Sequence, residues 1–490
     1  MGNHIIHKQK VTLQVSSQEN AFDMQNRISR LLKDDLPPVM ESVLNKISPN
    51  GKILRIDQLN LDLGAISMLN LESEFRSKLI EKLEEALYSA MAEKGELRVE
   101  EISGEQSLSD SLMYFLLHGI MPWYSTVKDF SAWESQIIQS FSENEWRSLS
   151  GKIRSEGSRT HPLLLRLAQQ FSIPFLQKFI LRGQTILDKD ADLLFDDLKF
   201  LWAEFSKGPV DTGYRKEVGF WQEALNASVI SDHINEMIFS FIKSILLKQR
   251  LIRISRDGLI IAGNDHLARI KLLGKNIKTD EVHEALEMLT HSLDETGMQK
   301  KEPALKDGPE EEKPVTIPKP PDDGDELFAE NCGIVLLHPF LQMYFAELGL
   351  LENEQFRDDD ARQRGVLLLH YLATGQTNIA EIHLIIPKLL CAMNFEEPVP
   401  GEIDLTGKEK EESETLLHSV IRHWGALGNT SPDGLRQTFL QRDGKLVRTD
   451  TGWKLNVEQK TVDILMGKLP WGISAIRLPW MNTVLNIEWV

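Results

Sequence analysis

The chain has 490 residues, of which 73 are acidic and 55 basic, giving a formal net charge of −18. This balance argues against sequence-independent binding of nucleic acid, which needs clustered Lys and Arg to displace counterions, and against an anionic membrane surface. No run of about 18 apolar residues predicts a transmembrane helix, and the first residues lack the layout of a secretory signal. Two cysteines exclude a disulfide framework and indicate a reducing compartment. We therefore expect a protein made in the cytoplasm, with about three domains.

Residues 1–103 predict a small α/β domain. We expect strands over 11–15, 53–63 and 97–100, and helices from about Ser17, over 39–47 and over 71–87. Apolar residues change phase within the second strand, near Asp57, which predicts a bulge or a break there. The order of these elements indicates a sheet backed by helices.

Residues 104–296 have the period of amphipathic helices almost throughout and predict a helical middle region. Residues 297–325 differ sharply, since six of the chain's 20 prolines lie between Pro303 and Pro321 among Lys and Glu runs. Few apolar residues are present there to offset the entropy of ordering, so this composition predicts a semi-extended linker.

Residues 326–490 predict a Trp-rich C-terminal domain that is helical to about Leu440. Short strands follow over 445–448, 453–457 and 484–489. The first two flank Asp450-Thr451-Gly452, which predicts a hairpin. The expected fold class is thus α+β, mainly α-helical, with a small α/β unit, a helical middle and a mostly helical C-terminal domain ending in short strands.

The sequence offers no constellation for catalysis, for a cofactor or for a metal. It has no phosphate loop, no dinucleotide fingerprint and no nucleophile elbow. The acidic run 358–360 lacks the Gly and terminal Glu of a calcium loop, so a solvated acidic face is the favoured reading. Cys391 lies on an apolar helix face, where a thiol usually serves as a small packing group. We expect no catalytic residue, no cofactor and no metal ligand.

Tryptophan is concentrated near the end of the chain, with five of ten between residues 424 and 490. Such density marks either a specifically packed core or a contact surface, and both readings stay open. We expect Trp471, which lies between Pro470 and Gly472, to be mainly structural. The candidate protein-contact residues are Trp480, Trp489 and Trp123.

Several short sequence blocks of unusual residue composition follow one another along the chain. They read Arg55-Ile56-Asp57-Gln58-Leu59-Asn60-Leu61-Asp62-Leu63-Gly64, Phe115-Leu116-Leu117-His118-Gly119-Ile120-Met121-Pro122-Trp123, Asn331-Cys332-Gly333, Leu337-His338-Pro339-Phe340, Gln363-Arg364, His370-Tyr371-Leu372-Ala373-Thr374-Gly375, Lys388-Leu389-Leu390-Cys391, His423-Trp424 and two Pro-Trp pairs. In this order they resemble the contractile injection system tape measure proteins, components of phage-tail-like particles in bacteria.

The resemblance implies a non-enzymatic structural or assembly component, a tape measure protein that sets the length of the inner tube. The alternative is an assembly chaperone, or a cap- or baseplate-associated factor that binds tube subunits. The implied partners are inner tube, baseplate, spike or cap proteins, with no nucleic acid and no membrane. Homo-oligomer formation stays open, as does retention in the particle after assembly in the cytoplasm.

A ruler works by linear extension, and at about 1.5 Å per helical residue the chain could reach on the order of 700 Å. The sequence instead indicates separate domains, because it lacks one unbroken heptad seam.

The linker composition generates a first prediction. Residues 297–325 are expected to be the most protease-sensitive stretch of the native protein. Limited trypsin digestion followed by mass spectrometry should therefore release a C-terminal fragment that begins near Lys313 or Lys319. Early cuts elsewhere, with this stretch resistant, would contradict the two-part organisation.

Overall fold

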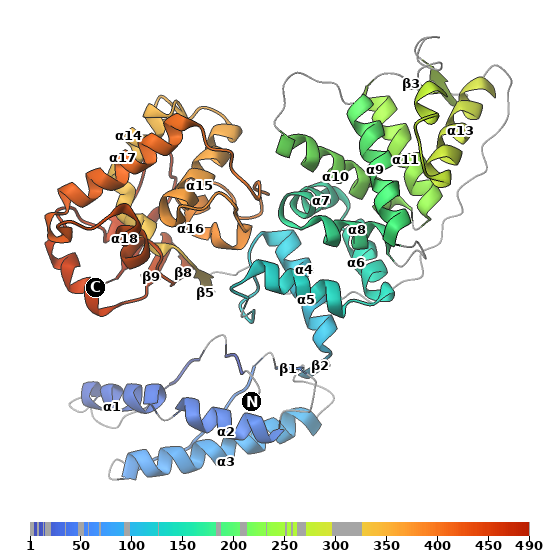
Figure 1. The fold of residues 1–490 in the computed structure, drawn as a ribbon. Coiled ribbons are helices and arrows are strands. Elements are labelled where there is room, and N and C mark those ends of the chain that lie inside the picture. The colour runs from blue at the N-terminus through green and yellow to red at the C-terminus, as the bar shows by residue number, and fades with distance from the viewer. Residues whose placement is uncertain are drawn as a thin grey trace. The chain divides into compact units, whose positions relative to one another are not determined.

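The chain forms two compact units in the computed structural model (Figure 1). The residues described are 4–6, 9–12, 14, 21–34, 36–47, 53–56, 58–67, 70–92, 99–125, 127–182, 188–205, 213–231, 233–249, 252–255, 258–261, 271–295 and 326–489. The first unit comprises Met1–Ser111 and Tyr124–Thr126, and the second comprises Leu112–Trp123 and Val127–Val490. The predicted linker lies outside the described residues, and the expected domain boundaries stay predictions.

Three helices build the core of the first unit. Its elements are α1 (Ala21–Asp34), α2 (Leu36–Ile47), β1 (Ile53–Ile56), α3 (Leu71–Ala92), β2 (Val99–Ile102) and the start of α4 (Gly104–His118). Apolar residues recur every four positions along α3, from Leu71 to Leu87, so they share one helix face. This face packs against Ile28 of α1 and Val39 and Val43 of α2. Strands β1 and β2 pair antiparallel, with Ile53 opposite Ile102.

The sequence predictions for this unit meet with mixed success. The helices are confirmed. Of the strand expected over 53–63, only the first part is confirmed, as β1 (Ile53–Ile56), whereas residues 58–63 form no strand. The strand expected over 11–15 is wrong for residues 11, 12 and 14, which form no strand. Val11 is 43 % exposed, so its side chain supplies no buried apolar contact that would favour a strand.

Helices dominate the first half of the second unit. They are α5 (Phe130–Ser140), α6 (Glu143–Ser155), η3 (Gly157–Arg159), α7 (Thr160–Gln170), α8 (Ile173–Leu181), α9 (Asp188–Phe205), α10 (Gly213–Ile230), α11 (Ile234–Lys248) and α13 (Asp280–Glu295). Side chains mark some starts, since Ser142 and Glu145 form a capping box on α6. The antiparallel hairpin of β3 (Ile252–Ser255) and β4 (Gly258–Ile261) was not expected from the sequence. No helix in the described ranges is both long and apolar enough to cross a membrane.

The C-terminal part, residues 326–489, combines short helices with a small sheet. Its helices are η4 (Cys332–Leu337), α14 (His338–Glu347), α15 (Asp359–Thr374), η5 (Glu381–His383), α16 (Ile385–Leu390), α17 (Gly407–His423), η6 (Gly425–Leu427), α18 (Pro432–Leu435), η7 (Arg436–Leu440) and η8 (Thr461–Lys468). Its strands are β5 (Glu326–Ala329), β6 (Leu351–Glu352), β7 (Gln355–Phe356), β8 (Gly444–Thr449), β9 (Gly452–Val457), β10 (Ala475–Ile476) and β11 (Val484–Glu488).

Five of these strands form one sheet in the order β10-β11-β9-β8-β5. Strands β8 and β9 form the predicted hairpin, and β11 pairs parallel to β9. Strand β5 was not expected. The fold class, α+β and mainly α-helical, is confirmed.

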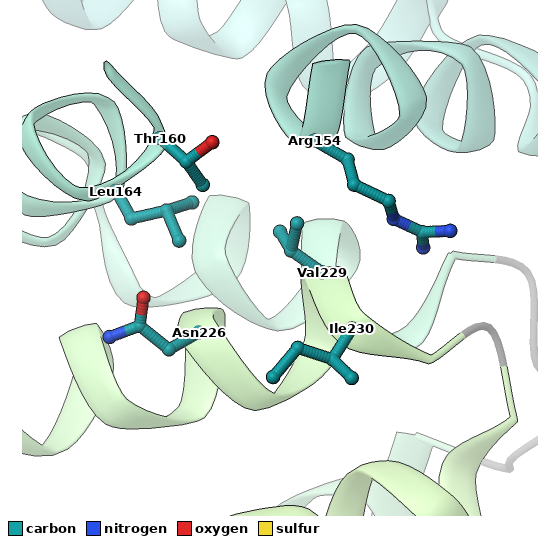
Figure 2. Close-up of a pocket in the computed structure, with 6 residues that line it drawn as sticks. All are labelled: Arg154, Thr160, Leu164, Asn226, Val229 and Ile230. Carbon is teal, nitrogen blue, oxygen red and sulfur yellow. The ribbon is translucent and has the colours of Figure 1, made fainter. Parts of the chain in front are cut away.

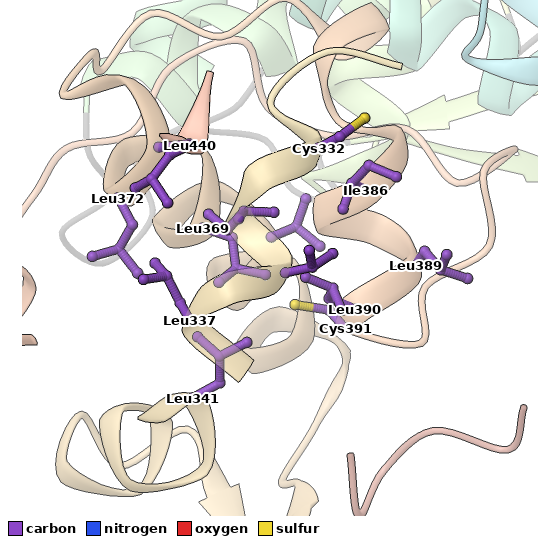
Figure 3. Close-up of a cluster of buried hydrophobic side chains, with 14 of the residues drawn as sticks. Cys332, Leu337, Leu341, Leu369, Leu372, Ile386, Leu389, Leu390, Cys391 and Leu440 are labelled. Atoms are coloured by element: carbon purple, nitrogen blue, oxygen red, sulfur yellow. The ribbon is translucent and has the colours of Figure 1, made fainter. Parts of the chain in front are cut away.

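The core of the C-terminal part explains several of the sequence blocks (Figure 3). Cys332 and Cys391 are free and buried among leucines, and burial raises the pKa of both thiols. A Cβ atom on Gly333 would lie 1.7 Å from the carbonyl oxygen of Phe439, so only glycine permits this approach. At the end of α15, Gly375 has φ +73°, which terminates the helix in the left-handed conformation.

The tryptophans of the C-terminal part differ in burial from what their positions suggested. Trp480 is 5 % and Trp489 2 % exposed, and both pack in the core. Their indole N–H groups donate to the Leu390 carbonyl at 2.7 Å and to the Asp463 carboxylate at 3.2 Å. Trp471, expected to be mainly structural, is half-buried. A contact role for Trp480, Trp489 and Trp123 stays a prediction.

Burial of Trp480 predicts a large structural effect of its removal. Trp480→Ala should lower the free energy of unfolding by about 3–5 kcal/mol, because it empties a large site and orphans the Leu390 carbonyl. Hydrogen exchange of the full chain in increasing urea, read at residues 326–489, measures this loss. Trp123→Ala, at a side chain 37 % exposed, is the comparison and should cost less. Equal stability of Trp480→Ala and the parent would contradict the packing seen here.

Candidate functional site

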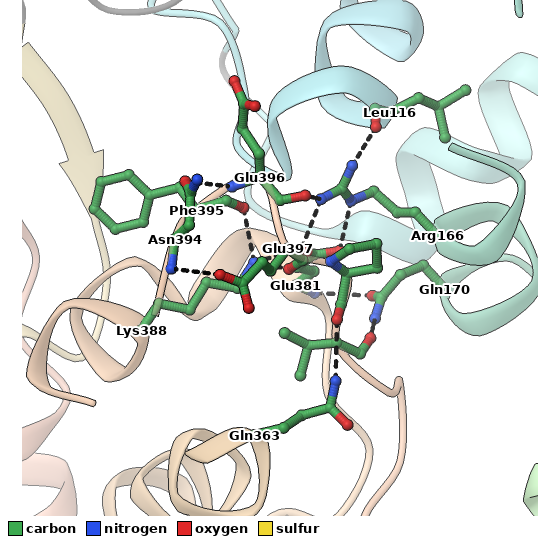
Figure 4. A network of polar contacts seen from close by, with 12 residues as sticks. Leu116, Arg166, Gln170, Gln363, Glu381, Lys388, Asn394, Phe395, Glu396 and Glu397 are labelled. Carbon is green, nitrogen blue, oxygen red and sulfur yellow. Dashed lines mark hydrogen bonds and ion pairs between the residues drawn. The ribbon is translucent and has the colours of Figure 1, made fainter. Parts of the chain in front are cut away.

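A buried charge network joins α7 to residues 379–403 of the C-terminal part (Figure 4). The Glu381 carboxylate accepts hydrogen bonds from Arg166 Nε at 2.8 Å and Nη2 at 3.2 Å. It also accepts one from Lys388 Nζ at 2.5 Å. All three side chains are at most 1 % exposed. One carboxylate is thus shared by two cations that come from α7 and from α16.

Backbone carbonyl groups accept hydrogen bonds from further donors of the two cations. Arg166 donates to the carbonyl of Leu116, at the end of α4, and to that of Glu396 at 2.7 Å. Lys388 donates to the carbonyls of Phe395 at 2.8 Å and Glu397 at 2.7 Å. A buried charge is costly unless it is paired and hydrogen-bonded. Burial lowers the pKa of Lys388, and the Glu381 carboxylate acts in the opposite direction.

Neutral hydrogen bonds extend the network on one side. Gln170 accepts from the Glu381 amide at 2.9 Å and donates to the Val399 carbonyl at 2.7 Å. The Tyr214 hydroxyl of α10 accepts from the Gly401 amide at 2.8 Å and donates to a carbonyl of α7 at 3.3 Å. Burial raises the pKa of Tyr214 to about 12, so its hydroxyl stays neutral at pH 7 and keeps both roles.

Two glycines allow the backbones to approach on either side of the network. A Cβ atom on Gly119 would lie 2.6 Å from Glu381 Oε1 and 2.6 Å from the Phe395 carbonyl oxygen. Gly119 also has φ +68°, which ends α4. A Cβ atom on Gly401 would lie 2.3 Å from the Gln169 carbonyl oxygen. Neither position has room for a larger residue unless the backbone moves.

Three of the sequence blocks converge here. The block 115–123 supplies Gly119 and His118, whose Nδ1 lies 3.1 Å from Glu396 Oε1 and whose pKa burial lowers. The block 388–391 supplies Lys388, and the block 363–364 supplies Gln363, which donates to the Pro398 carbonyl at 3.1 Å. Three of the blocks that carry the resemblance therefore contribute to the network or its immediate surroundings.

The network has the properties of a structural joint. Its charged groups are enclosed and already hydrogen-bonded to one another, which leaves no activated nucleophile beside a free base. In the part of the chain that the structure describes, no group of three or more His, Cys, Asp or Glu could hold a metal.

A hollow of about 390 Å³ lies elsewhere, between α6, α7 and α10 (Figure 2). It is lined by Arg154, Thr160, Leu164, Asn226, Val229 and Ile230. This lining contains no carboxylate, imidazole or thiol, so it offers no acid–base pair.

His370, in the block 370–375, is buried outside the network. It is 3 % exposed, and neither ring nitrogen has a hydrogen-bond partner among the described residues. Burial lowers its pKa to about 4, so the ring is neutral at pH 7 and packs as an apolar group.

The sequence analysis did not single out Arg166 or Glu381 as site residues. The sequence nevertheless contains a signal for the two cations of the network. Arg166 interrupts the apolar run 163–168, and Lys388 interrupts the run 385–391. A cation on the apolar face of a helix must find a buried partner. Nothing local marks Glu381 as that partner, because it lies 215 residues from Arg166. The predicted contact residues Trp123, Trp480 and Trp489 form none of the network's hydrogen bonds described above.

The close approach at Gly401 generates a prediction. Gly401→Ala should destabilise the docked C-terminal part by about 1–3 kcal/mol, because the new methyl group meets a backbone carbonyl that cannot rotate away. Hydrogen exchange of the full chain, read at residues 379–403 and 160–170, measures the loss. Gly467→Ala is the matched control, since its Cβ would meet no atom within 4 Å. Equal protection of both variants would contradict the joint.

One family of known proteins matches nearly the whole chain. No curated protein and no solved structure matches it. A family model, described as contractile injection system tape measure protein, matches residues 3–489. The expectation drawn from the sequence blocks is confirmed: the chain belongs to the contractile injection system tape measure protein family.

Proposed function

We propose that this protein sets the length of the inner tube of a contractile injection particle as a folded, non-enzymatic component. Membership of a structural family over residues 3–489 is the observation that carries the proposal. Membership implies association with other components of the particle. We propose the inner tube and the baseplate, spike or cap proteins as the direct partners, with assembly in the cytoplasm.

A second candidate function, assembly chaperone or cap- or baseplate-associated factor, is favoured by the compactness of the described residues. The longest described helix, α3, has 22 residues, which corresponds to about 33 Å. The second unit is organised around buried apolar cores and the charge network. A ruler that works by extension would have to unfold these cores, whereas an assembly factor would not.

Changing the chain length at the predicted linker separates the two functions. Insertion of two further copies of residues 300–320 leaves every described element unchanged. A ruler should then lengthen the tube by up to about 140 Å, because the proline-rich insert is expected to be extended. Electron microscopy of purified particles measures the distribution of tube lengths. An assembly factor predicts an unchanged length.

The control carries the same segment with its order scrambled and its length unchanged. If length depends on residue number, the scrambled chain gives tubes of the parent length. A change in yield without any change in length, for both the insertion and the scrambled chain, would refute the ruler and support the assembly factor.

A further inference from the structure

Three distant segments meet at an aromatic cluster on the surface of the C-terminal part. Phe340 of α14 packs edge-on against Trp471, with ring centroids 5.3 Å apart, and against His423 at the end of α17, 5.7 Å away. Met343 follows one helical turn after Phe340 and is 65 % exposed. We call Phe340, Met343, His423 and Trp471 the aromatic patch; none of the four is buried.

Trp471 is hydrogen-bonded to the backbone beneath the patch. Its indole N–H donates to the Leu336 carbonyl at 3.2 Å, which satisfies its only polar atom inside the protein. The half-buried ring therefore offers apolar surface to a partner at little entropic cost, which is a property of interface anchors.

The stretches next to the patch residues are poor in acidic side chains, although exposed Glu347 follows Met343 by one helical turn. Residues 338–346, 415–432 and 464–487 contain no Asp or Glu, although acidic residues outnumber basic ones 73 to 55 in the chain. Arg422 directly precedes His423, and Lys468 lies three residues before Trp471. Both are exposed, and neither forms an ion pair with any described residue. Two unpaired cations, Arg422 and Lys468, therefore lie close in sequence to the aromatic patch, against one exposed carboxylate, Glu347, and we call these two cations its basic rim.

We propose that the aromatic patch docks an acidic surface of a partner protein that presents apolar side chains. Aromatic residues at the centre and charged residues at the rim are the usual composition of a protein interface. A second copy of this chain is an alternative outcome of the test below. An anionic membrane typically requires clusters of about four to eight basic residues, and the rim supplies two. The proposal rests on the proposed function only in taking the partner to be a particle component.

Photo-crosslinking in cells that assemble particles tests the proposal with the full chain. A photoreactive benzoylphenylalanine replaces Met343, and mass spectrometry identifies the crosslinked peptide. We expect an acidic peptide with apolar residues from one particle protein. In the Arg422→Glu, Lys468→Glu background the crosslink should fall about tenfold or more, because the rim then faces like charge.

The matched control is Arg147→Glu with Lys410→Glu, an equal change of charge at exposed residues on α6 and on the first turn of α17. The crosslink should be unchanged there, and both double variants should melt like the parent. Absence of a crosslink, a crosslink to a second copy or to a basic peptide, or equal loss in both backgrounds overturns the proposal. Flotation with phosphatidylserine vesicles that depended on the rim would overturn it in favour of a membrane.

The insertion experiment keeps this inference distinct from the proposed function. If tube length responds to the inserted residues but Met343 gives no crosslink, the docking surface is wrong and the length-setting role stands. If the crosslink forms while tube length ignores the insertion, the ruler fails and the docking surface stands.

Discussion

The sharing of one carboxylate by two buried cations is the constraint on which the arrangement of the second unit depends. Glu381 lies within hydrogen-bond distance of both Arg166 and Lys388. Removing Glu381 would leave two charges in a low-dielectric interior, which is far costlier than losing an exposed ion pair. The position of residues 379–403 against α7 is therefore fixed by electrostatics as well as by apolar packing. Backbone carbonyls from 395–397 complete the cage, so the local backbone path is fixed too.

The joint also requires two glycines, which let the backbones approach each other. Hydrogen bonds to backbone carbonyls require that the chains come close, and Gly119 and Gly401 provide the space on opposite sides. A joint of this kind specifies geometry more strongly than a purely apolar interface, because its bonds have fixed lengths and directions. It suits a protein whose parts must keep a set arrangement while other components assemble.

The helices and the C-terminal hairpin could be predicted from the sequence because their signals are local. The four-residue spacing along α3 and the turn at 450–452 act over a few residues. The hairpin β3–β4 and the edge strand β5 were missed because a four-residue strand carries little periodicity of its own. For β5, pairing with β8, more than a hundred residues away, decides its structure.

The site was harder to predict for the same physical reason. Its sequence blocks could be recognised one by one. That they lie together in the fold depends on contacts between residues more than two hundred positions apart in the sequence. The burial of the C-terminal tryptophans also depends on pairing between distant segments. Trp480 and Trp489 lie near the end of the sequence. They are nevertheless buried in the core, and the strand between them, β11, pairs with β9. Nearness to a terminus is a poor guide to exposure when the terminal strand joins a sheet.

The folded core of the second unit also limits which parts of the chain could determine a length by stretching. Folded domains are stable by about 5–15 kcal/mol, while removing a single buried Trp or Phe typically costs about 3–5 kcal/mol. Stretching the second unit would expose many such residues together with the charges of the joint. The second unit therefore resists extension, because unfolding it would expose its apolar core and the buried charges of the joint at the same time.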